Sequence, residues 1–150
     1  MLDGWLEFHR GTLITKCAGL TDEQLRLRSV EPSGLSLLGL LRHMTEVELW
    51  WFDTVFSGGP LPKFYSTPED RDADFHDTDG TTGDEAFANW TAACAQARQQ
   101  VEGKDLDQIC VRPDTEISLR WIFIHMIEEY ARHNGHADLL RERIDGATGD

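Results

Sequence analysis

A row of histidines and acids in the last third of the chain offers the clearest chemistry in the sequence. His125, Glu129 and His133 are spaced four residues apart, and His136 follows three residues later. An α-helix makes one turn in about 3.6 residues, so steps of three and four place side chains on one face. Imidazole and carboxylate groups aligned in this way are typical of a hydrogen-bonded polar network or of a metal site.

The helix that would carry this row is apolar on most of its surface. Ile122 and Leu140 flank the polar row at its two ends, so we expect the row to lie within a side that faces the interior. A buried network of these groups would lose the hydration of its members, and a bound cation would offset that loss. Both interpretations stay open on these residues alone.

A second polar residue interrupts an apolar helical stripe upstream. His43 lies in phase with Leu40, Val47 and Trp50, within a segment predicted to be helical from Ser36 to Phe56. Helical bundles form metal sites from ligands that project inward from facing helices. We therefore expect His43 to point toward the polar row of the last helix.

Together these groups form a ligand set with a recognisable chemical preference. His43, Glu129 and His133 would supply two imidazoles and one carboxylate, which suit Zn²⁺ or another divalent first-row metal. Three protein ligands leave a position for water or substrate, as in catalytic sites. The alternative is a buried network of these side chains with His125.

The elements that must position these residues are helices throughout. The sequence predicts one all-α domain over residues 1–150, an antiparallel four-helix bundle with long crossover connections. A loop rich in Asp, Thr, Pro and Gly is expected from Leu61 to Gly83, and a short extended connection over Gln108–Pro113. The predicted long helices cover residues 2–18, 36–56, 84–102 and 118–144, with Ser36, Asp84 and Ser118 as N-caps and a short capped turn at Thr21.

Side chains on the first helix and in the acidic loop are given structural roles. Trp5 and Phe8 are expected close to the buried side of the first helix, and His9 is expected to point inward. The acidic run Glu69–Asp74 is interpreted as a solvated loop, and His76 as a surface residue.

Charge and hydropathy exclude several classes of partner. The formal net charge of −13 argues against nucleic acid, because phosphate binding requires clustered Lys and Arg, and against an anionic membrane surface. No run of about 18 apolar residues predicts a membrane span, and nothing resembles a secretion signal. A cytoplasmic location and a small-molecule substrate are expected, and the large apolar residues suggest homodimerisation through helix faces.

The three cysteines predict no disulfide framework. Cys17, Cys94 and Cys110 are widely spaced, odd in number and free of a C-x-x-C pattern. Cys17 and Cys94 fall on apolar helix faces, where a small buried thiol is the common outcome.

The segment His125–Gly135, with His43 in the upstream run Leu41–Glu48, resembles the DinB-like / YfiT-like superfamily of metal-binding four-helix bundles. The resemblance covers essentially the whole chain, by helix order and by ligand position. Many members have three histidines, and here Glu129 stands at the second ligand position. A His, Glu, His set is similar to that of the mycothiol-dependent maleylpyruvate isomerases, which are zinc enzymes. The resemblance implies His43, Glu129 and His133 as ligands of a divalent metal, zinc or nickel.

The resemblance also implies a class of reaction. Such proteins are often transferases or isomerases that use a low-molecular-weight thiol such as mycothiol or bacillithiol, and a metal would bind this thiol as the nucleophilic thiolate. His125 and His136 are then expected to orient ligands or to transfer a proton. Glu46 is expected at the surface or beside a ligand, and Arg132 in a salt bridge to a neighbouring helix. The isomerases have a second domain, whereas this chain is expected to form a single bundle.

Two hypotheses from different classes follow. The first is a metal-dependent transferase or isomerase with a small thiol as cosubstrate. The second is a non-catalytic bundle, either a metal-binding stress-response protein or a dimeric interaction module with a vestigial site. An enzyme needs a pocket beside an open coordination position, whereas a vestigial site would be plugged by a side chain from the loop at residues 61–83.

Overall fold

Helices dominate the computed structural model, which describes residues 1–61, 65–76, 78–111 and 116–149. Apart from one isolated bridge between Ile109 and Ser118, no β-structure occurs in these ranges, so the all-α prediction is confirmed. Arg112 and Pro113, the end of the predicted extended connection, lie outside the described residues. The elements are α1 (Leu2–Cys17), α2 (Asp22–Arg26), α3 (Leu37–Glu48) continued by the π-helix η1 (Leu49–Phe56), α4 (Ala73–His76), α5 (Gly83–Val101) and α6 (Leu119–Asp145).

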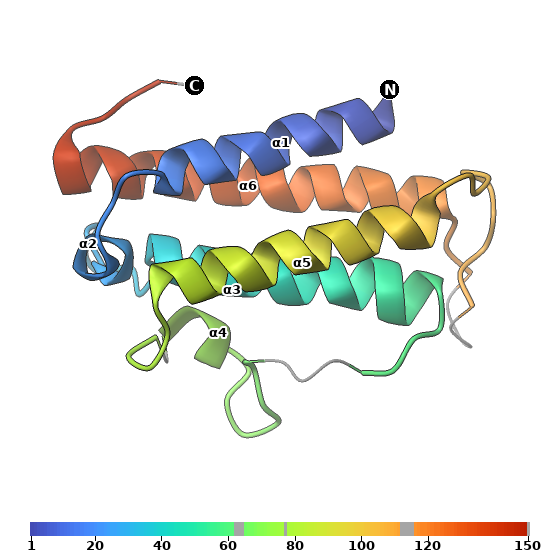
Figure 1. Ribbon diagram of the computed structural model, residues 1–150, viewed down its shortest axis with the longest axis horizontal. Helices are drawn as coiled ribbons and strands as arrows, with labels where there is room; N and C mark the ends of the chain where they lie inside the picture. Colours follow the sequence, from blue (N-terminus) through green and yellow to red (C-terminus); the bar gives the residue numbers. More distant parts are fainter. Residues whose placement is uncertain (62–64, 77, 112–115, 150) are drawn as a thin grey trace.

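The long helices lie side by side in two parallel pairs (Figure 1). Helices α1 and α6 run in the same direction, since Asn134 donates to the backbone carbonyl of His9 and Arg141 to that of Lys16. Helices α3 and α5 form the second pair, antiparallel to the first. The connection from η1 to α5 therefore returns the chain along the length of the molecule (Figure 1).

Side-chain caps begin most of these helices, as the sequence predicts. Ser36 and Ser118 each accept a hydrogen bond from a backbone N–H in the first turn, and Thr21 takes part in a capping box. Helix α5 differs from the prediction, because Thr82 rather than Asp84 is its N-cap. The cap lies two residues earlier because the Thr82 hydroxyl accepts the Glu85 N–H.

On α1, the expectation that Trp5 and Phe8 lie close to the buried side is wrong, and the expectation that His9 points inward is only partly met. Trp5 and Phe8 are 55% and 56% exposed, and His9 is half-buried. The inward row of α1 instead includes Leu6 and Arg10, which are buried. Helix α1 packs on α6 and α3, which leaves the tryptophan and phenylalanine on its outer side.

A buried polar cluster, here called the core network, joins the four long helices. Arg10 of α1 donates from Nε and Nη2 to the carboxylate of Glu48 on α3, at 2.8 and 2.5 Å. Tyr130 of α6 donates to the same carboxylate at 2.7 Å and accepts from Trp90 of α5 at 2.9 Å. The Sγ atom of Cys94 lies 3.6 Å from Oε1 of Glu48. Burial raises the pKa of the Cys94 thiol and of the Tyr130 hydroxyl, which keeps both groups protonated as donors.

The loop before α5 contains a short helix that the sequence analysis did not predict. Helix α4 packs on α3 at Gly39, where an added Cβ would lie 2.6 Å from the carbonyl oxygen of Phe75. Asp74 of α4 is only 3% exposed, so the interpretation of Glu69–Asp74 as entirely solvated is wrong at this residue. His76 is exposed, as expected.

The burial of the three cysteines and the apolar content of the helices bear on two further predictions. Cys17, Cys94 and Cys110 are free and buried, as expected for the first two. None of the helices in the described ranges has the length and apolar composition needed to span a bilayer. The cytoplasmic location and the homodimer stay predictions.

Candidate metal centre

Three predicted ligands meet between α3 and α6. One ligand atom from each of His43, Glu129 and His133 lies within 4.8 Å of the others. The two imidazole rings are 4.7 Å apart, and His133 is the most buried of the three, at 7% exposure. Antiparallel packing of α3 on α6 brings together residues that are about 90 positions apart in the chain. We call this group the metal centre.

His43 is held on two sides by α4. Its Nδ1 lies 2.7 Å from Oδ2 of Asp74, and its ring stacks on Phe75 with 4.4 Å between centroids. The contact with Asp74 leaves Nε2 as the nitrogen of His43 that can bind a metal. Sequence reasoning missed Asp74, and the only signal was that apolar Ala73 and Phe75 flank it within an acidic run.

His133 lies between Glu129 and His136 on the same helix. Its Nε2 is 3.5 Å from Oε2 of Glu129, and its Nδ1 is 3.4 Å from Nδ1 of His136. Burial, followed by the nearby His43, His136 and Arg132 charges, lowers the pKa of His133 to about 3. The ring is therefore neutral at pH 7, and metal binding requires this neutral form. The donor set fits a divalent cation.

His125 is one turn from the metal centre, in an aromatic setting. Its ring stacks on Trp121 at 5.0 Å and meets the edge of Trp51 at 4.6 Å. Its Nε2 is 3.7 Å from Oε1 of Glu129. His125 and His136 thus each contact one predicted ligand, and their catalytic role stays a prediction.

Arg132 differs from the expectation of a salt bridge to a neighbouring helix. It pairs with Glu128 and, at 3.3 Å, with Glu129, both on its own helix. The pairing follows from the three- and four-residue spacing, which places these side chains on one face. Glu128 also forms a second candidate cluster with His125 and Glu129, but it is exposed.

A pocket of about 370 Å³ opens beside His43. Glu46 lines it and accepts hydrogen bonds of 2.7 Å from both the backbone N–H and the hydroxyl of Ser66. Burial raises the pKa of Glu46, and the bonds from Ser66 partly oppose that effect. Glu46 is 9% exposed, so of its two expected positions the surface one is wrong. The lining residues are His43, Glu46, Val47, Trp50, Ser66, Arg71 and Asp74.

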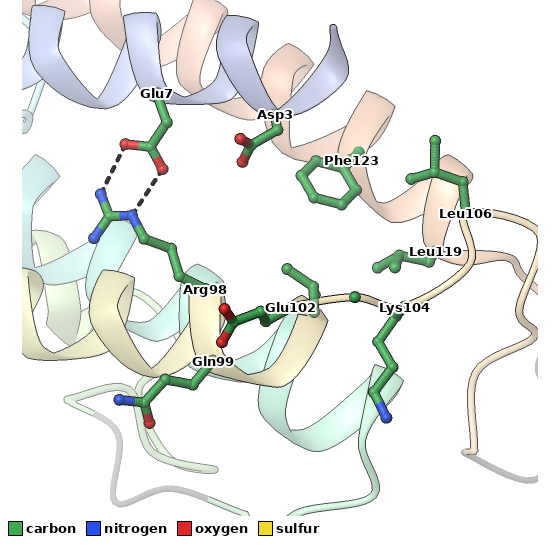
Figure 2. A pocket seen from close by; sticks show the side chains of 11 residues that line it. Asp3, Glu7, Arg98, Gln99, Glu102, Lys104, Leu106, Leu119 and Phe123 are labelled. Atoms are coloured by element: carbon green, nitrogen blue, oxygen red, sulfur yellow. Dashed lines mark hydrogen bonds and ion pairs between the residues drawn. The ribbon is translucent and has the colours of Figure 1, made fainter.

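A larger pocket, of about 560 Å³, lies elsewhere, between α1, α5 and the start of α6. Figure 2 shows the Glu7–Arg98 ion pair on one side of it and Leu119 and Phe123 on another. Its lining includes no histidine and no cysteine. We therefore place the candidate chemistry at the smaller pocket, where a ligating side chain forms part of the wall.

Comparison with known proteins agrees with this fold. A crystal structure of a conserved protein from Enterococcus faecalis superposes with a TM-score of 0.66, at 14% sequence identity, over 97% of this chain and 96% of that one. This likeness shows the fold alone. No curated protein sequence matches significantly.

The family comparison is more specific. The model of the mycothiol-S-transferase family, which is a DinB-like family, matches residues 1–146. This match spans all the long helices and every candidate site residue, and it agrees with the resemblance noted from the histidine and glutamate pattern. The chain therefore belongs to the mycothiol-S-transferase family of DinB-like proteins.

Proposed function

We propose that this protein is a divalent-metal-dependent S-transferase that joins the sulfur of mycothiol to a small electrophile. The observation that carries the proposal is the convergence of His43, Glu129 and His133, with ligand atoms within 4.8 Å of one another. The family match supports the thiol as cosubstrate. Zinc is the proposed metal, since two imidazoles and one carboxylate suit it, and nickel is the second choice.

The chain's own residues would divide the work around the bound thiol. A divalent ion at the metal centre would supply the Lewis acidity that keeps a thiol ionised near neutral pH. Nε2 of His125 lies 3.7 Å from Oε1 of Glu129. From this position, the His125 imidazole would accept the proton that the thiol loses. His136 Nδ1 faces Nδ1 of His133 and would orient that ring.

The pocket beside His43 favours an enzyme over a vestigial metal site. It has room for a small molecule, and Glu46, Ser66 and Arg71 give it groups that can bind the polar body of a thiol cosubstrate. Phe75 belongs to the loop that was expected to plug a vestigial site. Its ring stacks on the face of the His43 ring, and it is not among the residues that line the pocket. The sulfur would attack the electrophilic carbon, whose leaving group departs with the bonding electrons.

Metal content tests the centre directly. Untagged protein purified without added metal is compared by elemental analysis with His133→Ala and with His76→Ala, a matched control at an exposed histidine. We expect about one zinc or nickel ion per chain in the parent and the control, and a large loss in His133→Ala. A parent protein that holds no metal and takes up no added Zn²⁺ would refute the proposal.

Turnover separates an enzyme from a metal-binding module. Metal-loaded protein is incubated with mycothiol and a panel of small electrophiles, and the loss of free thiol is followed. We expect turnover that disappears in His43→Ala and persists in His76→Ala. A metal-loaded protein with no turnover on any electrophile supports the non-catalytic alternative.

A further inference from the structure

We propose that α4 is a clamp that sets the tautomer and the ring plane of His43, with Asp74 as the positioning residue. Helix α4 is part of the connection between η1 and α5, and it packs against α3. The effect on metal affinity rests on the proposed function above, whereas the effect on the tautomer does not.

Asp74 fixes which nitrogen of His43 carries the proton. A carboxylate can only accept hydrogen bonds, so the 2.7 Å contact with Nδ1 requires a proton on that nitrogen. In the neutral ring, Nε2 then keeps its lone pair. The other oxygen of Asp74 accepts from the backbone N–H of Phe75 at 3.0 Å. With both oxygens engaged and 3% exposure, the carboxylate has little freedom to turn away.

Phe75 fixes the plane of the same ring. Its side chain stacks on His43 with 25° between the planes and lies 6.1 Å from the ring of His133. Rotation of the His43 ring would break both the stacking and the bond to Asp74. Adjacent residues of α4 therefore restrain His43 in two different ways, one through a nitrogen and one through the ring face.

Gly39 makes the close approach of α4 possible. A Cβ at this position would lie 2.6 Å from the carbonyl oxygen and 3.0 Å from the Cα of Phe75. Both are backbone atoms, so α4 would have to move as a unit. Gly39 is one turn before His43 on α3. The same helix therefore supplies the ligand and the space for the segment that orients it.

The tautomer is measured by ¹⁵N NMR of the imidazoles in metal-free protein at pH 8. We expect His43 in the parent as the Nδ1–H form, with Nε2 unprotonated, and a shift toward a mixture in Asp74→Ala. Asp74→Asn should retain much of the parent signal, because its amide oxygen can still accept from Nδ1–H. A parent His43 in the Nε2–H form, or an Asp74→Ala spectrum identical to the parent, overturns the proposal.

Zinc affinity is measured by competition with a chromophoric chelator. We expect about 10- to 100-fold weaker binding in Asp74→Ala, as for the loss of other groups that orient ligands, and partial recovery in Asp74→Asn. Gly39→Ala should also weaken binding, although it removes no polar group. Gly11→Ala is the matched control, since a Cβ there meets nothing within 4 Å.

The outcomes keep the two proposals apart. Zinc binding by the parent that is equally tight in Asp74→Ala and Gly39→Ala, together with a tautomer that does not change in Asp74→Ala, overturns the clamp and leaves the proposed function standing. If the His43 tautomer changes in Asp74→Ala but the parent binds no zinc, the clamp is supported and the metal-dependent function is refuted. Urea unfolding of each variant shows whether a loss of affinity comes from a loss of folded protein.

Discussion

The interior of the molecule holds two polar clusters that share the same pair of helices. The core network uses Glu48 of α3 and Tyr130 of α6, and the metal centre uses His43 of α3 with Glu129 and His133 of α6. Glu129 and Tyr130 are neighbours in the chain, yet one belongs to each cluster. Successive residues of a helix point about 100° apart, so one helix can serve both.

The two clusters differ in how their charge is balanced. In the core network, Arg10 lies against Glu48 and the hydroxyl of Tyr130 donates to the same carboxylate, so donors and acceptors match within the protein. In the metal centre, three electron-pair donors converge, and the basic partner of Glu129 is the exposed Arg132 on its outer side. The first arrangement holds helices together, whereas the second suits an external cation.

Breaking the core network should give the largest effect on stability. Glu48→Leu removes the buried partner of Arg10 and leaves only Glu7, whose side chain is 36% exposed. We therefore expect a loss of about 3–5 kcal/mol in the free energy of unfolding. The double variant Arg10→Met/Glu48→Leu should recover much of this loss, because no unpaired charge remains. Urea unfolding of metal-free protein measures both. A single variant within about 1 kcal/mol of the parent would contradict the assignment.

Zinc should stabilise the folded protein through the metal centre alone. Free Zn²⁺ at one hundred times its dissociation constant should add about 2.7 kcal/mol to the free energy of unfolding. His133→Ala should lose this gain, whereas His76→Ala should keep it. Thermal unfolding with and without Zn²⁺ measures the difference, and an equal gain in His133→Ala would place the metal elsewhere.

Acid should lower the free energy of unfolding of the metal-free protein in a defined pH range, because of His133. The pKa of His133 falls from 6.5 in the unfolded chain to about 3 in the folded one. Between these values the unfolded state binds more protons, so the free energy of unfolding decreases as the pH falls. From pH 6.5 to pH 5 this difference amounts to about 1.5 kcal/mol. His133→Gln, measured with a chelator present, should show a flatter pH profile than the parent.

Removing Arg132 should give the smallest change and affect only the metal centre. Its side chain is 53% exposed, so Arg132→Gln should alter the free energy of unfolding by less than about 0.5 kcal/mol. Zinc affinity should rise by about two- to threefold, because a cation beside Glu129 competes with the metal. Chelator competition provides the measurement, and a loss of affinity would show that Arg132 instead orients Glu129.

Much of the fold was accessible from local sequence signals. Ser36 and Ser118 mark helix starts, and the spacing of apolar residues gives the lengths of the long helices. The two halves of the ligand set were also accessible, because His43 and the Glu129–His133 pair are polar residues on apolar helical faces. That such faces meet follows from the need to bury them.

The parts that sequence analysis missed depend on contacts across the chain. Arg10 and Glu48 look like surface residues of amphipathic helices. Their pairing with each other, supported by Glu7 and Tyr130, allows both to be buried. Asp74 looks like one more acid in a solvated run, and only the close approach of α4 to α3 at Gly39 gives it a partner. No local pattern contains that information.

The sequence by itself determined the long helices, most of their inward faces and the residue types that could hold a metal, because these depend on the periodicity and on the caps of single segments. The tertiary structure decided which polar residues pair within the protein and which converge as ligands. Those outcomes depend on distances between α1, α3, α4 and α6, and such distances are fixed when the apolar faces pack and the buried charges find partners.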